Sequence, residues 1–359
     1  MSASKLFSPF KLGGLELKNR VVMAPMTRCR ATQDHLPTEP MIKYYADRAD
    51  AGLIITEGTA PAANGAGYAR IPGIYSDQQI AGWKKITGAV HAKGGRMFMQ
   101  LMHTGRATHT LSLPAGERMI APSAIGLSGE IWTDQQQMQP YPVPAAMTAE
   151  EVETTINAFV SASMNAMAAG FDGIELHGAN GYLIDQFLNT ASNQRTDIWG
   201  GSISNRTRFA VEAAKRVAAK IGANRVGMRI SPYGLFNDMK PDSEMDAMYA
   251  HLIAEISTIG LAYIHVVDHS SMGAPEVKPA TKAMIRKNFR GAYILSGGYD
   301  ASRAGQDLEN GLGDLVAFGR PFISNPDLVD KLKSGQGLAA ADASTFYTPG
   351  EPGYNSYAA

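Results

Sequence analysis

The sequence predicts a (β/α)8 TIM barrel, and two observations carry this prediction. Short apolar, β-branched runs alternate with longer amphipathic stretches from residue 20 to the end of the chain. That order favours a parallel sheet with helical crossovers. Eight such runs can be counted, and eight strands close this kind of barrel. The length of 359 residues fits one barrel with insertions, so we expect a single domain over residues 1–359.

The eight expected strands are spread along the chain in order. They are Arg20–Met26, Leu53–Glu57, Arg96–Met102, Gly173–His177, Val226–Ser231, Tyr263–Asp268, Ala292–Ser296 and Leu315–Gly319.

Helices are expected between these strands, and two of them have clear start signals. Ser76–Gln79 and Thr148–Glu151 place a hydroxyl three residues before an amide or a carboxylate, the pattern of a capping box. Gly170 is expected to end the second helix. The apolar residues expected on its barrel-facing side are Ile156, Phe159, Val160, Met164 and Met167.

Two segments depart from the repeat. Phe10–Lys18 alternates around Gly13 and Gly14, which predicts a small N-terminal β-hairpin at the N-terminal mouth of the barrel. His103–Met147 is rich in Gly, Pro, Ser and Gln and has no sustained period. Excursions of that length usually form lids or binding loops. We therefore expect a long lid insertion after strand 3, with Trp132 close enough to the site to report on it.

Composition limits the classes of partner. Lys plus Arg equals Asp plus Glu at 33 each, which leaves no basic field for nucleic acid or for a membrane surface. No apolar run approaches the roughly 20 residues of a membrane span, and the first ten residues lack the features of a secretory signal. Cys29 is the one cysteine. We expect a reducing cytoplasmic location, small-molecule partners and no metal site.

Polar residues stand where the expected strands end, which is where barrel enzymes build their sites. The first strand ends in Pro25, Met26 and Thr27, the third contains Gln100, and the fifth carries Arg229.

The last two strands predict a phosphate site. Strand seven runs into Gly297 and Gly298, and strand eight into Gly319 and Arg320. Barrel phosphate sites often use these two loops, glycine allows close backbone approach, and arginine offers a charged fork. A tight turn beside a surface arginine is the alternative interpretation.

A short loop after strand four carries three candidate catalytic residues. His177 and Asn180 could direct two donors at one oxygen atom and stabilise negative charge that develops there. Tyr182 offers a phenol that could deliver a proton nearby. A lone histidine at a strand end is more often structural, but three such residues above a phosphate site favour function.

Five motifs, in order, resemble those of the Old Yellow Enzyme family, and the resemblance extends from Leu6 to the tyrosine-rich tail. It implies an FMN barrel that uses NAD(P)H to reduce activated C=C bonds of α,β-unsaturated carbonyls and nitroalkenes, with nitrate esters as a further class. The motifs are Met23–Arg28, Gln100–Arg106, Glu175–Tyr182, Asn193–Asp197 running into Gly200–Ser202 and Asn205–Arg206, and Phe318–Arg320.

The resemblance implies roles around a non-covalent FMN. Thr27 would hydrogen-bond to the flavin C4 carbonyl, Gln100 would bind the pyrimidine edge, and Arg229 would lie beside N1 and the C2 carbonyl. Three alternatives stay open: Thr27 as a strand cap, Gln100 as a satisfied interior amide, and Arg229 as the partner of a buried carboxylate. The same resemblance assigns further cofactor contacts to Pro25, Met26, Gly58, Gly297, Gly298, Gly319 and Arg320.

It also implies a substrate pocket. His177 and Asn180 would hold the activating oxygen of the substrate, and Tyr182 would protonate the carbon next to the carbonyl. The residues expected to line the pocket with them are Tyr68, Met102 and Tyr347.

Two departures from the family pattern affect this pocket. Met102 stands where many relatives have tryptophan, so a flat wall is expected to give way to a flexible thioether. Another branch has a cysteine at the position of Thr27. Here Cys29 lies two residues later, so we assign the chain to the Thr-bearing branch and expect Cys29 to be a small buried filler.

Two other functions compete. A non-redox barrel lyase or isomerase acting on a phosphorylated substrate would use the same phosphate site. Glu57 is its best candidate base, and no lysine stands at a strand tip. A flavoprotein that stores electrons is the other alternative, but an oxygen-binding pair with a proton donor would then be superfluous.

Overall fold

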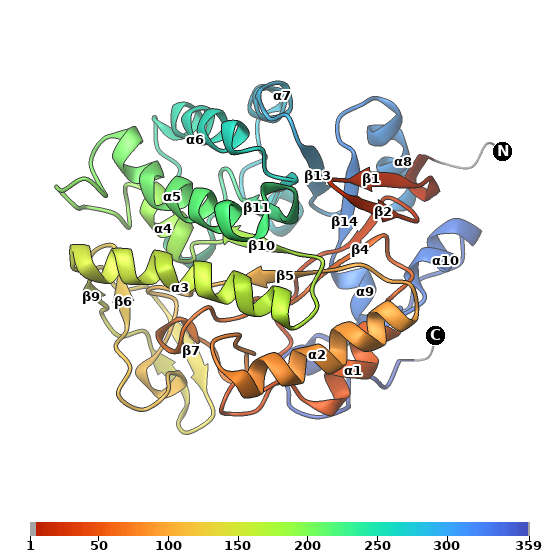
Figure 1. Cartoon of the computed structure of the whole chain (residues 1–359), viewed down its shortest axis with the longest axis horizontal. Helices are drawn as coiled ribbons and strands as arrows, with labels where there is room; N and C mark the ends of the chain where they lie inside the picture. Colours follow the sequence, from red (N-terminus) through yellow and green to blue (C-terminus); the bar gives the residue numbers. More distant parts are fainter. Residues whose placement is uncertain (1–4, 358–359) are drawn as a thin grey trace.

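The computed structural model describes residues 5–357, and a closed barrel of eight parallel strands lies at its centre (Figure 1). The order around the barrel is β10-β11-β12-β13-β14-β3-β4-β5. All eight expected strands are confirmed, with ends that differ from the expected ones by at most three residues. The strands are β3 (Val21–Met23), β4 (Leu53–Ile55), β5 (Met97–Leu101), β10 (Gly173–Gly178), β11 (Val226–Ile230), β12 (Tyr263–Val267), β13 (Ala292–Ser296) and β14 (Leu315–Phe318).

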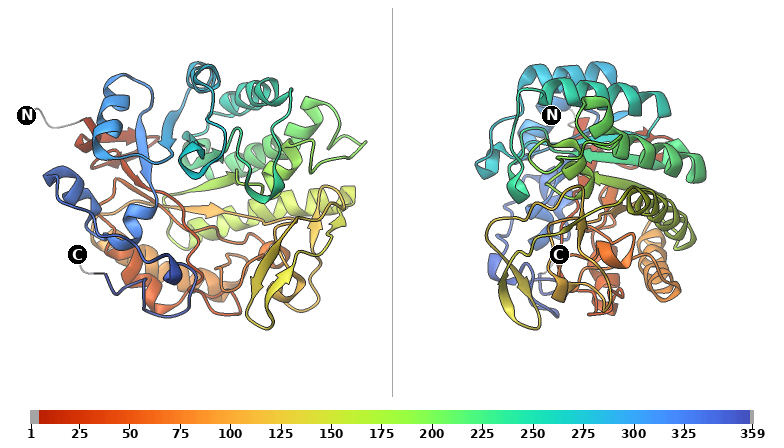
Figure 2. Two further views of the ribbon diagram at one scale, coloured as in Figure 1. Left: turned by 180° about the vertical axis from the view of Figure 1, so that it is seen from behind. Right: turned by 90° about the vertical axis from the view of Figure 1, so that its left-hand side faces the viewer.

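Helices surround the barrel (Figure 2) and bury their apolar faces against it. Both expected capping boxes are present, at Ser76 and at Thr148, because each hydroxyl accepts a hydrogen bond from the backbone N–H three residues later. The helices are α1 (Glu39–Ala46), α2 (Asp77–Ala92), α3 (Ala149–Ala168), α4 (Leu183–Leu188), α5 (Ile203–Ile221), α6 (Met245–Ile259), α7 (Pro279–Asn288), α8 (Ala301–Glu309), α9 (Arg320–Ser324) and α10 (Leu328–Ser334).

One expected side chain of α3 lies on the wrong face. Ile156 and Phe159 are buried as expected, but Met164 is 51% exposed. The buried stripe continues instead through Ala162, Ser163 and Ala166, because neighbouring helices pack closely against small residues there. The expectation from hydrophobicity alone was therefore wrong for Met164, which lies at the margin of the buried stripe.

The N-terminal hairpin closes one end of the barrel, as predicted. β1 (Phe10–Leu12) pairs antiparallel with β2 (Leu15–Leu17). Leu12 and Leu17 pack in one apolar cluster with barrel residues that include Val22 and Phe98. This end of the barrel is filled with side chains, so ligands must enter from the other end.

The insertion after β5 contains more regular structure than its sequence indicated. β7 (Glu130–Thr133) and β8 (Gln137–Pro140) form an antiparallel hairpin, seen in yellow in Figure 2. β6 (Ile120–Ala121) and β9 (Ala145–Ala146) pair in parallel at its base. The hairpin was missed because the polar Asp134–Gln137 stretch interrupts any apolar alternation.

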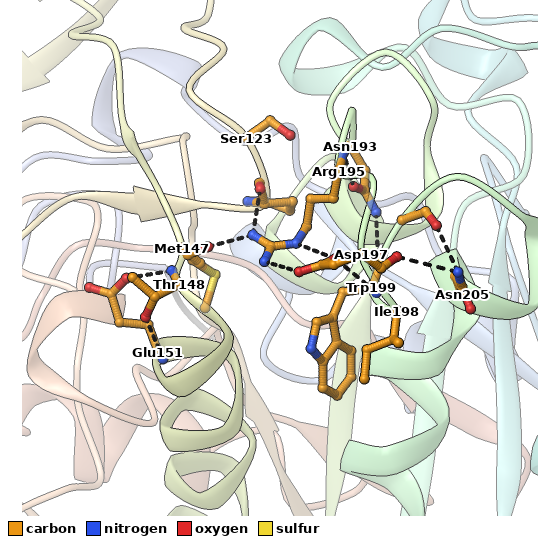
Figure 3. Close-up of polar contacts among 12 residues, drawn as sticks. Ser123, Met147, Thr148, Glu151, Asn193, Arg195, Asp197, Ile198, Trp199 and Asn205 are labelled. Carbon is orange, nitrogen blue, oxygen red and sulfur yellow. Dashed lines mark hydrogen bonds and ion pairs between the residues drawn. The ribbon is translucent and has the colours of Figure 1, made fainter.

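Arg195 anchors the base of this insertion (Figure 3). Its guanidinium donates to the carbonyl oxygens of Pro122 and Met147, which flank the β6–β9 pair, and it also pairs with Asp197. The backbone N–H of Gln194 donates to Ser123 Oγ at 2.9 Å. The Asn193–Asp197 motif therefore holds both ends of the insertion, and the β7–β8 hairpin extends from a fixed base.

Among residues 5–357, no helix combines the length and the apolar character that crossing a bilayer requires.

Candidate functional site

Two cavities lie at the C-terminal ends of the barrel strands. The first has a volume of about 820 Å³ and the second about 560 Å³. They adjoin, since six residues line both of them: Pro25, Thr27, Asn180, Arg229, Phe236 and Tyr347.

The second cavity contains all the residues expected to bind phosphate. Gly297, Gly298, Gly319 and Arg320 line it together. Gly298 has a φ of +64°, and a Cβ on Gly297 would lie 2.3 Å from the carbonyl oxygen of Asp268. Only glycine fits at these two positions, which leaves backbone close to the cavity, and Arg320 is exposed at the start of α9. This arrangement suits a phosphate group.

Gln100 and Arg229 line the first cavity, and the buried carboxylate of Glu175 contacts Gln100 and acts electrostatically on Arg229. Gln100 Nε2 donates to Glu175 Oε1 at 2.8 Å, and His265 Nδ1 lies 2.9 Å from Glu175 Oε2. Burial lowers the pKa of Arg229, and the charge of Glu175 opposes that effect. Within the described chain, Arg229 Nε has no hydrogen-bond partner although it is buried. Arg229 lines both cavities, although its Nε is itself sealed from them.

The first strand end contributes as expected, with one exception among the cofactor residues. Pro25 and Thr27 line both cavities, and Met26 lines the second. Gly58 lines neither. A Cβ on Gly58 would lie 2.4 Å from Met102 Sδ, so this glycine makes room for the Met102 side chain. Its contact with a cofactor stays a prediction.

His177 is a buried histidine that faces the first cavity. Burial lowers its pKa well below the usual value, and the positive charge of Arg229 adds to this shift. The ring is therefore neutral at physiological pH. Its Nδ1 atom is buried and has no partner among residues 5–357, whereas a structural histidine would normally be satisfied.

Tyr182 packs against His177 with ring centroids 4.9 Å apart. Its hydroxyl lies 3.1 Å from that of Tyr68, and both residues line the first cavity. Burial raises the pKa of Tyr182 to about 12. The phenol accordingly keeps its proton at physiological pH and is available as an acid in its resting state.

The backbone around Asn180 is held on two sides. Asn180 has a left-handed φ of +61°, which is uncommon for a residue with a side chain. Its N–H donates to Ser231 Oγ at 2.8 Å, and its carbonyl accepts from Asn237 Nδ2 at 2.8 Å. Gly181 N–H donates to Asp185 Oδ2. These contacts fix the loop that carries Asn180 and Tyr182, whereas His177 is held in β10.

The remaining walls are largely apolar. Met102 and Cys29 line the first cavity and pack in one cluster with Ile71. Burial raises the pKa of the Cys29 thiol to about 12, which makes it unreactive. Cys29 is buried as expected, but it also forms part of the cavity wall. Tyr347 lies at the opening and is 61% exposed.

Several cavity residues escaped prediction from sequence. Phe236 and Asn237 come from the loop after β11, and Met138 comes from the β7–β8 hairpin, whose Trp132 lines the first cavity as expected. His269, two residues beyond the end of β12, lines the second cavity. His269 could have been predicted, because residues that follow the ends of barrel strands form the site. Nothing in a loop sequence indicates that Phe236 or Asn237 folds back over the barrel.

Glu57, the base of the competing lyase, lies away from both cavities. Its carboxylate accepts from the Arg28 N–H and from the Tyr45 hydroxyl, each at 3.2 Å. Burial raises its pKa to about 7. Its contacts give Glu57 a structural role.

Comparisons with known proteins agree with this site. Residues 5–338 match the model of the NADH:flavin oxidoreductase / NADH oxidase family. The chain belongs to this family. A probable flavin mononucleotide-dependent alkene reductase of Leishmania infantum is 43% identical over 99% of this chain and 98% of that protein.

Two solved structures share the whole fold. Morphinone reductase in complex with tetrahydroNAD is 42% identical and superposes with a TM-score of 0.93, covering 98% of this chain and 97% of that one. An Old Yellow Enzyme homologue from Zymomonas mobilis is 37% identical with a TM-score of 0.95, covering 99% of each chain. The Old Yellow Enzyme resemblance is confirmed, and the chain is an FMN-dependent NAD(P)H oxidoreductase of the ene-reductase class.

The residues present fit FMN. One cavity offers glycines and an arginine for a single phosphate, and the guanidinium of Arg229 lines both cavities. A fixed positive charge at that point suits a ring system that becomes anionic on reduction.

Proposed function

We propose that His177, Asn180 and Tyr182 carry the reduction of α,β-unsaturated carbonyls and nitroalkenes in this chain, with nitrate esters as a further substrate class. The observation that carries the proposal is the neutral imidazole of His177 in a cavity that Asn180 and Tyr182 also line. Its Nδ1 is sealed from the cavity, so a ligand oxygen would bind the other ring nitrogen, Nε2.

Cofactor binding is assigned to residues of both cavities. Thr27, Gln100 and Arg229 would hold the ring system, with Pro25 and Met26 beside it. Gly297, Gly298, Gly319 and Arg320 would hold the phosphate without a covalent bond. FMN, when bound, supplies the hydride that NAD(P)H delivers to it.

The substrate residues then have distinct tasks. His177 and Asn180 hold the activating oxygen and stabilise the negative charge that develops on it. Tyr182 delivers its hydroxyl proton to the carbon next to the carbonyl, because its high pKa keeps that proton in place until a stronger base forms. Tyr68, at 3.1 Å, can stabilise the Tyr182 phenolate by donating a hydrogen bond to it. Met102 and Tyr347 shape the walls.

Oxidation of NAD(P)H by the purified holoenzyme, without oxygen, tests this function. We expect slow oxidation alone and rapid, stoichiometric oxidation when 2-cyclohexenone or a nitroalkene is added. Rates that no alkene increases would contradict the proposal, and a colourless protein active on a phosphate ester would favour the lyase.

A further inference from the structure

The loop after β12 places a second histidine against the candidate substrate-binding residues. His269 Nε2 lies 2.7 Å from Asn180 Oδ1. We propose that His269 is a positioning residue that fixes the Asn180 amide with its NH2 group facing the substrate. This inference rests on the proposed role of Asn180.

The Asn180 amide needs such a partner because its two ends have opposite chemistry. The oxygen accepts hydrogen bonds and the NH2 group donates them. A rotation of about 180° about the last side-chain bond would exchange them. Only the NH2 end can bind the oxygen of an enone or a phenolate. An amide in the other orientation would present its own oxygen to the substrate oxygen, and the two would repel.

His269 is suited to select one orientation. The residue is buried, its ring packs on Phe236 with centroids 4.8 Å apart, and it follows β12 whereas Asn180 follows β10. Burial lowers its pKa to about 4, with the charge of Arg229 adding to the shift, so the ring is neutral. A neutral imidazole carries one N–H. With that proton on Nε2, the ring donates to Asn180 Oδ1 and directs the NH2 end away from itself.

The rest of the Asn180 residue is already fixed. Its backbone N–H and carbonyl are held by Ser231 and Asn237, so the side-chain amide is the part still free to rotate. His269 supplies the missing restraint. The consequence for the site is a preference for ligands that bring an acceptor oxygen.

Phenol binding to the holoenzyme tests this without turnover. The dissociation constant of 4-hydroxybenzaldehyde can be followed through the change in flavin absorbance for the wild type, His269→Phe, His269→Gln, Asn180→Ala and the double variant. His269→Phe keeps a ring against Phe236 but has no N–H. His269→Gln keeps a donor.

We expect His269→Phe to weaken phenol binding about 3- to 10-fold, the span of one net hydrogen bond, with FMN content and melting temperature unchanged. His269→Gln should recover most of the loss. In the Asn180→Ala background His269→Phe should add nothing, because the amide that it orients is gone.

Three results would overturn the inference: unchanged phenol binding in His269→Phe, an equal loss in the Asn180→Ala background, or a loss of bound FMN in His269→Phe. A separate result would contradict the proposed function. If Asn180→Ala alone binds phenol normally, Asn180 does not hold the substrate.

Discussion

An unpaired nitrogen is the feature of His177 that requires an explanation. Leaving a buried polar atom without a partner costs about 1–3 kcal/mol, and the structure provides none for Nδ1 within residues 5–357. The neutral ring, held beside Arg229, can donate one hydrogen bond without carrying a charge that would need a counter-ion. A bound oxygen atom cannot reach this sealed nitrogen and would bind the ring through Nε2, so the unpaired Nδ1 is a cost of keeping a neutral hydrogen-bonding ring in the cavity.

His177→Ala should therefore weaken phenol binding and enone reduction together. Donors that act mainly in the transition state typically contribute on the order of 10²–10³ in rate. Flavin absorbance titration and single-turnover kinetics measure the two effects. FMN content should be unchanged. Normal phenol affinity would remove His177 from the substrate site, and loss of FMN would show a structural histidine instead.

At the scale of elements, the β7–β8 hairpin forms part of the wall between the first cavity and solvent. Trp132 is 48% exposed yet lines the first cavity, and Arg70 pairs with Asp134 on the hairpin while donating to the Tyr347 carbonyl. The hairpin is thus held at its base by Arg195 and near its tip by Arg70. Motion of the hairpin between its two fixed points stays a prediction.

Trp132 should report on ligand binding. The other two tryptophans, Trp83 and Trp199, are buried and line neither cavity, so a ligand in the first cavity should alter mainly the emission of Trp132. Titration with a phenol should change tryptophan fluorescence in the wild type and much less in Trp132→Phe. An equal change in both proteins would show that Trp132 is not in contact with the ligand.

For the whole molecule, the phosphate site predicts one particular cofactor chemistry. The second cavity provides for a single phosphate through Gly297, Gly298 and Arg320, and the sequence lacks the dinucleotide turn of FAD-binding folds. Acid precipitation should release FMN into the supernatant, identified by chromatography. Yellow colour retained in the pellet, or FAD in the supernatant, would be inconsistent with this site.

The sequence was sufficient to predict the barrel but not all the residues that line the cavities. The eight strands are short buried runs with strong periodicity, and the residues at their ends point to the same mouth because parallel strands share one direction. That geometry explains why His177, Asn180, Arg229 and Arg320 could be placed in advance. The single-domain organisation and the cytoplasmic location stay predictions.

Contacts between distant segments were beyond sequence reasoning. Asn237 reaches Asn180 from a loop 57 residues away, and the β7–β8 hairpin pairs through a stretch with no apolar alternation. Gly58 lines neither cavity and leaves room for the Met102 side chain, and the sequence could not show that a glycine beside a strand end serves a neighbouring side chain. Each of these contacts depends on tertiary packing between segments that are far apart in the chain.

The central claim is that one site serves two half-reactions with different residues. Flavin reduction by NAD(P)H requires no proton from Tyr182, whereas saturation of an enone does. Tyr182→Phe keeps the ring against His177 and removes the hydroxyl proton. Anaerobic stopped flow of each half-reaction in this variant is the most direct measurement of the claim.

We predict that Tyr182→Phe leaves flavin reduction by NAD(P)H nearly unchanged and slows reoxidation by 2-cyclohexenone by roughly 10²–10⁴, the usual span for general acid catalysis. A nitroalkene should lose much less, since the nitro oxygens can hold the negative charge until water protonates the product. Equal losses for both substrates would mean that Tyr182 only positions them, and undiminished enone reduction would contradict the account.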